Sequence, residues 1–125
     1  MAYRMAGIDD PGKAIQFAEV DNRYSFKELQ FIEALGLAGG RGGEAVKMLR
    51  EGAFEPGGGG SPSTPAAAPG GEGVPFEAHG LARLLYAVEA LRGGMHGPDG
   101  ETALVHGWRG GVPTTTSAAV VLGGR

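Results

Sequence analysis

Histidines with carboxylates close to them along the chain are the residues in this sequence whose types could do chemistry. Imidazole and carboxylate groups bind divalent metals and transfer protons, and the sequence holds three histidines near acidic residues: His79, His96 and His106, with Glu77, Glu89, Asp99 and Glu101. Their spacing matches no common pattern of metal ligands, and none has an evident partner for general acid–base catalysis. We therefore predict surface histidines, no catalytic residue, no metal site and no cofactor.

The chain of 125 residues contains no cysteine. This excludes a disulfide scaffold, a cysteine-ligated zinc or iron–sulfur site and a thiol nucleophile within these residues. The sequence also lacks the nucleophile elbow, the Walker A loop and the zinc-protease, calcium-loop and kinase motifs. We therefore predict a protein that is not an enzyme and has no small-molecule substrate.

The glycine-rich segment 36–43 has the composition of a phosphate-binding loop, because glycine amides at the start of a helix bind anions. It follows a predicted helix rather than a strand, so we interpret it as the turn of a helical hairpin over residues 25–51. Arg41, Lys47 and Arg50 would also allow this hairpin to act as a helix-turn-helix. A small regulatory DNA-binding adaptor is therefore our alternative hypothesis, although the net charge of −3 disfavours nucleic acid as a partner.

Local signals predict the elements of the N-terminal part. Ser25 and Glu28 fit a capping box at the start of a helix over residues 24–36, and Gly36 suits its left-handed end. A second helix over residues 44–51 would turn Val46 and Leu49 inward. Asp10 and Pro11 are typical of an N-cap and the first position of a helix, so residues 11–20 can begin a helix. Ile15 and Phe17 also alternate like a strand, and we favour a helix there.

The C-terminal part combines one helix with two strands. The leucine-rich periodicity of residues 76–92 predicts an amphipathic helix, whose expected core residues are Leu81, Leu84, Leu85, Val88 and Leu91. Residues 102–108 and 114–122 are typical of β-strands and form a hairpin that must pack on this helix or join strands elsewhere in the fold. The predicted fold class is therefore α+β.

A segment rich in glycine and proline separates the two parts. Residues 55–75 include seven glycines and five prolines, with one large apolar side chain, so they read as a linker. The predicted organisation is an arm and helical hairpin over residues 1–54, a linker over residues 55–75, and a helix with a β-hairpin over residues 76–125. Whether the two halves pack together is left open.

Several residues without a clear core role are candidates for contacts with a partner. Exposed aromatic side chains often anchor interfaces, a glycine in a helix often marks the close approach of another backbone, and an apolar strand can add to a partner's sheet. The interface candidates are Tyr3, Gly80, Tyr86, Trp108, Val120, Val121 and Leu122. We expect the partners to be protein subunits, including copies of this chain.

The overall pattern resembles a small virion or assembly protein of a tailed phage, and residues 24–37 are similar to the start of phage tail-assembly chaperones. This resemblance implies a structural role in an oligomer, such as capsid cementing or head–tail joining, in the virion or the host cytoplasm. The first seven residues lack the apolar region of a signal peptide. No segment has the length and apolar character of a membrane span, so a membrane partner is not expected.

Overall fold

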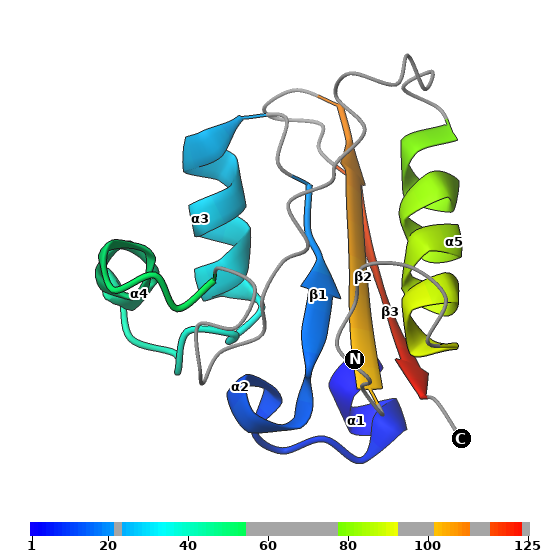
Figure 1. The fold of residues 1–125 in the computed structure, drawn as a ribbon, viewed down its shortest axis with the longest axis horizontal. Helices are drawn as coiled ribbons and strands as arrows, with labels where there is room; N and C mark the ends of the chain where they lie inside the picture. The colour runs from blue at the N-terminus through cyan, green and yellow to red at the C-terminus, as the bar shows by residue number, and fades with distance from the viewer. Residues whose placement is uncertain (22–23, 55–77, 93–101, 111–115, 124–125) are drawn as a thin grey trace.

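A computed structural model describes residues 1–21, 24–54, 78–92, 102–110 and 116–123 (Figure 1). In these ranges the elements are α1 (Ala2–Ala6), α2 (Pro11–Ala14), β1 (Phe17–Glu19), α3 (Ser25–Ala34), α4 (Glu44–Arg50), α5 (His79–Leu91), β2 (Thr102–Arg109) and β3 (Thr116–Gly123). The fold is therefore α+β, as predicted.

The strands form one sheet in the order β1-β2-β3. β1 runs parallel to β2, with Phe17 beside Ala103. β2 and β3 are antiparallel and pair from Thr102 with Gly123 to Arg109 with Thr116, which confirms the predicted hairpin. Because β1 precedes the predicted linker and β2 follows it, the two halves of the chain share a sheet. The linker itself, residues 55–75, lies outside the described residues, and the three-part division stays a prediction.

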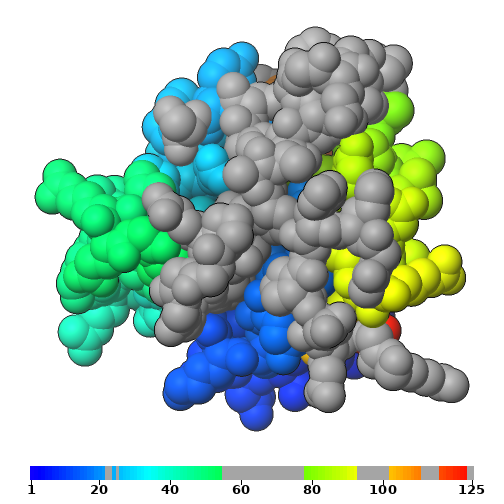
Figure 2. Space-filling model, in the orientation of Figure 1, coloured from blue at the N-terminus to red at the C-terminus, as the bar shows by residue number. Residues whose placement is uncertain are grey.

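Helices cover both faces of this sheet. Figure 1 shows α3 and α4 on one side and α5 on the other, and in Figure 2 the side chains of α4 (green) and α5 (yellow-green) form opposite sides of the molecule. Ile32 and Leu37 pack with Leu104 in the core on the α3 side. Ala87 and Ala90 pack with Phe17 in the core on the α5 side. Two cores on the two faces fix the register of the sheet, because a shift of one residue would exchange them.

Residues 11–20 are only partly helical. Asp10 is the N-cap of α2 and Pro11 follows it, as predicted, but Ile15 is extended and the chain continues as β1. All three residues of β1 are buried, which is typical of a strand with helices on both faces. The helix prediction for this region was therefore wrong beyond Ala14.

The hairpin of α3 and α4 is present, with a different inward face on α4. Gly36 adopts a φ of 71° after α3, as predicted for its left-handed end, while Tyr24 rather than Ser25 is the N-cap residue. Val46 and Leu49 are 41% and 51% exposed, whereas Ala45 is buried. The Glu33 carboxylate accepts hydrogen bonds from the N–H groups of Gly43 (2.7 Å) and Ala45 (3.3 Å), and this contact turns Ala45 inward.

The apolar face predicted for α5 was also partly wrong. Leu81 and Leu85 are 61% and 58% exposed, and the buried residues of the helix are Arg83, Ala87 and Ala90. Ala87 and Ala90 allow α5 to pack closely on the sheet, and Leu84 and Leu91 of the predicted face are partly buried against the same core.

Candidate functional site

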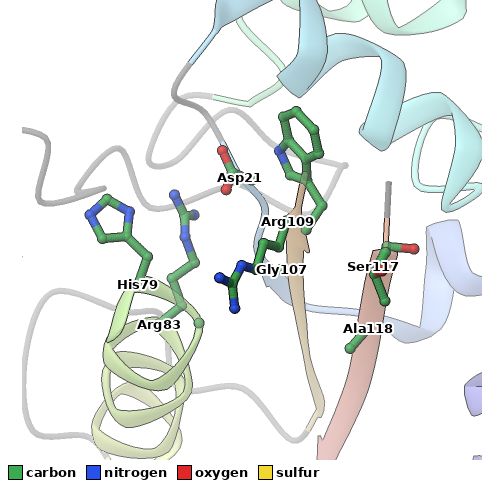
Figure 3. Close-up of a pocket in the computed structure, with 10 residues that line it drawn as sticks. Asp21, His79, Arg83, Gly107, Arg109, Ser117 and Ala118 are labelled. Carbon is green, nitrogen blue, oxygen red and sulfur yellow. The ribbon is translucent and has the colours of Figure 1, made fainter. Parts of the chain in front are cut away.

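A cavity of about 500 Å³ opens at the end of the sheet where β1 and β2 finish (Figure 3). Its walls come from the second residue after β1, the start of α5, the end of β2 and the start of β3: Asp21, His79, Gly80, Arg83, Gly107, Trp108, Arg109, Thr116, Ser117 and Ala118. The carboxyl ends of parallel strands are the usual binding position in α/β sheets. The cavity is therefore the candidate site.

Two glycines keep this corner of the molecule open. A Cβ atom built on Gly107 of β2 would lie 3.8 Å from the Cα atom of Gly80 in α5, so the helix and the strand meet there without side chains between them. Gly80 was predicted to mark the close approach of another backbone, and one such backbone is β2 of the same chain. Whether Gly80 also contacts a partner stays a prediction.

A buried arginine lies at the wall between α5 and β1. The Arg83 side chain is 2% exposed, and its Nη1 atom donates a hydrogen bond to the Val20 carbonyl. The same nitrogen lies 3.6 Å from Oε2 of Glu19, which is 3% exposed. This pair joins the helix to the strand directly beside the cavity.

Burial shifts the titration of Glu19. Removal of the carboxyl group from water raises its pKa to about 7, while the positive charge of Arg83 acts in the opposite direction. Desolvation is the larger effect, as expected for a buried ion pair. Near neutral pH, Glu19 therefore compensates the charge of Arg83 only in part.

His106 lies on the other face of β2. Its ring packs on Phe31 of α3 with 4.4 Å between the centroids, and among the described residues its buried Nδ1 atom has no hydrogen-bond partner. Burial lowers its pKa, the negative charge of Asp21 raises it, and the positive charge of Arg83 lowers it further. His106 is therefore a neutral core residue, and its prediction as a surface histidine was wrong.

Trp108 supplies the aromatic part of the site. Its ring lies 5.8 Å from that of Phe31, and Nζ of Lys27 lies 5.8 Å from the Trp108 centroid. Trp108 thus packs within the molecule between β2 and α3, and it also lines the cavity.

Basic groups outnumber acidic ones around the cavity. Figure 3 shows His79 and Arg83 on α5, with the Arg109 side chain extending from β2 toward α5. Asp21 is the only carboxylate among the described lining residues. The first N–H groups of α5 have no acceptor within the helix and add positive potential. This arrangement can bind an anion.

Comparison with known proteins identifies the family. Residues 1–124 match the family described as "Thiolase C-terminal domain-like". The chain belongs to this thiolase-like family. No curated protein and no solved structure matches it.

The family match corrects several predictions. A thiolase-like domain comes from an enzyme family, so the phage resemblance, the virion location and the structural assembly role were wrong. The match also gives no support to the DNA-binding alternative. The earlier resemblance rested on general organisation and on fourteen residues of non-specific helical pattern, whereas the family match spans residues 1–124.

None of the helices in the described ranges has the length and apolar character of a membrane-spanning helix.

The thiolase-like domain brings together only some of the predicted contact residues. Gly80 and Trp108 line the cavity, whereas Val120 and Val121 line a second cavity beside α1. The Tyr3 hydroxyl donates a hydrogen bond to the Leu35 carbonyl at 2.7 Å. Tyr86 lies on α5, and Leu122 packs against the core on that side of the sheet. Their roles as interface residues stay predictions.

The polar residues of the cavity were missed by the sequence analysis. Asp21, Arg83, Arg109 and Ser117 were not among the candidates. Arg83 had a usable signal, because it interrupts the apolar series from Leu81 to Leu85, and an arginine on the packed side of a helix needs buried partners. Arg109 had none, because only the fold places it opposite α5.

Proposed function

We propose that this thiolase-like domain binds a small, negatively charged acyl thioester in the cavity between α5 and the β2–β3 hairpin. In this proposal its side chains provide binding and orientation, not the attacking nucleophile. The observation that carries the proposal is the set of basic groups, His79, Arg83 and Arg109, around a cavity with one carboxylate, Asp21, among its described walls.

The anionic part of the ligand fits the chemistry of three elements. Arg109 is exposed, and its planar guanidinium group can donate two parallel hydrogen bonds to a carboxylate or phosphate. The first turn of α5 offers backbone N–H groups. Thr116 of β3, which pairs with Arg109 and lines the cavity, offers a hydroxyl. Arg83, a buried residue of the cavity wall, adds its positive charge.

The thioester part of the proposal rests on the family. Thiolases are named for cleavage by a thiol, and these 125 residues include no cysteine. A reacting sulfur would therefore come from the ligand or from residues outside this sequence. Trp108 and Ala118 provide apolar surface in the cavity for an acyl group. This proposal departs from the expectation of no small-molecule ligand.

Tryptophan fluorescence tests this function, because Trp108 is the only tryptophan in the chain and lines the cavity. We expect a saturable change with S-acetylthioglycolate, which carries a carboxylate, and at least about tenfold weaker binding of its neutral methyl ester. Arg109→Gln should weaken binding of the anion and leave the ester unaffected, while Arg50→Gln on α4 serves as the matched control. Equal affinity for both probes, or no saturable change with either, would overturn the proposal.

A further inference from the structure

β3 is an unprotected edge of the sheet in the described part of the chain. It follows β2 in the order β1-β2-β3, and in the described residues no strand lies beyond it. Apart from the pairing with β2, its eight residues make no backbone hydrogen bond with another described segment. An edge strand presents a row of N–H and C=O groups that can pair with a further strand.

The sequence of β3 lacks the features that usually block such pairing. Residues Thr116 to Gly123 contain no charged residue and no proline. Their pairing with β2 continues without a bulge through eight successive residue pairs, so the strand is regular along its length. Natural edge strands are commonly protected by lysine, proline or a bulge, and β3 has none of these.

The side chains of β3 form a surface that complements itself. We propose that β3 pairs antiparallel with β3 of a second copy of this chain, with Val120 opposite Val120 at the two-fold axis. In this register Ala118 faces Leu122 of the other copy, and Ala119 faces Val121. Each small side chain therefore lies opposite a large one, and no like charges meet across the pair.

Apolar surface beside the strand extends the proposed contact. Val120 is 43% exposed, and Met5 of α1 is 82% exposed. Both line a groove of about 330 Å³ together with Ala2, Ala6, Ala119 and Val121. A flexible methionine adapts to an irregular apolar surface, so α1 of each copy can cover part of the neighbouring strand. Ala118 belongs both to this interface and to the cavity at the start of α5, but the pairing of the strands does not depend on the proposed ligand.

The solution mass of the full chain tests the dimer. Light scattering after size exclusion should give twice the 12.7 kDa of the monomer. Val120→Lys places two like charges opposite each other at the axis and should raise the dissociation constant by about tenfold or more. Val46→Lys is the matched control, because Val46 is 41% exposed on α4, and it should leave the dimer intact. Circular dichroism checks that both variants are folded.

Cross-linking tests the register directly, because the chain has no cysteine of its own. Val120→Cys should form an intermolecular disulfide rapidly under mild oxidation, since paired residues of antiparallel strands have Cα atoms about 4.5–5.5 Å apart, within disulfide range. Val46→Cys should not. A monomer over the whole accessible concentration range, a dimer that Val120→Lys leaves unchanged, or equal cross-linking of the two cysteine variants would overturn the proposal.

Discussion

The Nη1 atom of Arg83 lies 3.6 Å from Oε2 of Glu19, and both side chains are almost fully buried between α5 and β1. This pair lies directly beside the cavity, which Arg83 lines. Arg83 also donates a hydrogen bond to the Val20 carbonyl. The protonation of Glu19 therefore affects both the stability of the fold and the positive potential of the site.

Glu19→Gln should remove one source of pH dependence from the stability. Burial raises the pKa of Glu19 from 4.5 to about 7 in the folded protein, so the folded state holds this proton more tightly than the unfolded state. The stability gained from this tighter proton binding by Glu19 is fully present below about pH 4.5. It is lost as the pH rises through about 7, and the loss is on the order of 3 kcal/mol. Denaturant unfolding at several pH values measures this loss.

The comparison with wild type isolates this group. Glutamine resembles the protonated carboxyl group, so the two proteins should be similarly stable at pH 4 and the variant should be the more stable at pH 8. A variant that is several kcal/mol less stable at pH 8 would show that the Coulombic attraction of Arg83 outweighs desolvation, contrary to this account.

Arg83→Met should destabilise the protein by about 3 kcal/mol at pH 8, because Glu19 loses the cation that offsets part of its desolvation and must either stay charged alone or bind a proton. The loss should be smaller at pH 5, where Glu19 is protonated in the folded state. Adding Glu19→Gln to Arg83→Met should recover part of the stability at pH 8. Chemical denaturation of the four proteins measures the coupling, and strictly additive effects would show that the two residues do not interact.

The pKa of His106 should lie below its ordinary value of 6.5 in the folded protein. Burial is the main cause of its lowered pKa and the negative charge of Asp21 opposes it, so Asp21→Asn should lower the pKa further. Because the unfolded chain takes up this proton first, the contribution of His106 to stability is present above pH 6.5 and decreases as the pH falls. NMR titration of the imidazole measures both pKa values. An upward shift in Asp21→Asn would contradict the assignment.

Gly36→Ala should cost about 2 kcal/mol and Gly7→Ala about 1 kcal/mol, measured by thermal or denaturant unfolding. Both glycines have left-handed backbones, with φ values of 71° and 68°. A Cβ atom on Gly36 would also lie 3.1 Å from Cγ of Pro11, whereas a Cβ atom on Gly7 meets nothing within 4 Å. Equal losses for the two variants would show that the contact with Pro11 is unimportant.

Local sequence signals predicted the elements better than their faces. The helix over residues 24–36 and the two hairpin strands follow capping, periodicity and glycine rules, which act within a few residues. The inward faces of α4 and α5 depend on contacts between distant segments. On α5 the buried residues are Arg83, Ala87 and Ala90, and Leu84 and Leu91 pack against the same core, whereas Leu81 and Leu85 are exposed.

The site was harder to predict because its parts are far apart in the chain. Asp21 lies two residues after β1, His79 begins α5 and Arg109 ends β2, and only the parallel pairing of β1 with β2 brings them to one end of the sheet. The pairing of β1 was missed, because a strand of three residues gives almost no periodic signal. Without it, Arg83 had no visible partner.

Mapping of amide chemical shifts on the full chain shows whether S-acetylthioglycolate binds in the cavity between α5 and the β2–β3 hairpin. We expect saturable shifts at Gly80, Gly107 and Ser117, around the cavity, and none at Ala45 on α4. The shifts should weaken when the neutral methyl ester replaces the anion. Shifts confined to α3 and α4, or no shift at the cavity at saturating concentration, would contradict the assignment of this cavity as the ligand site.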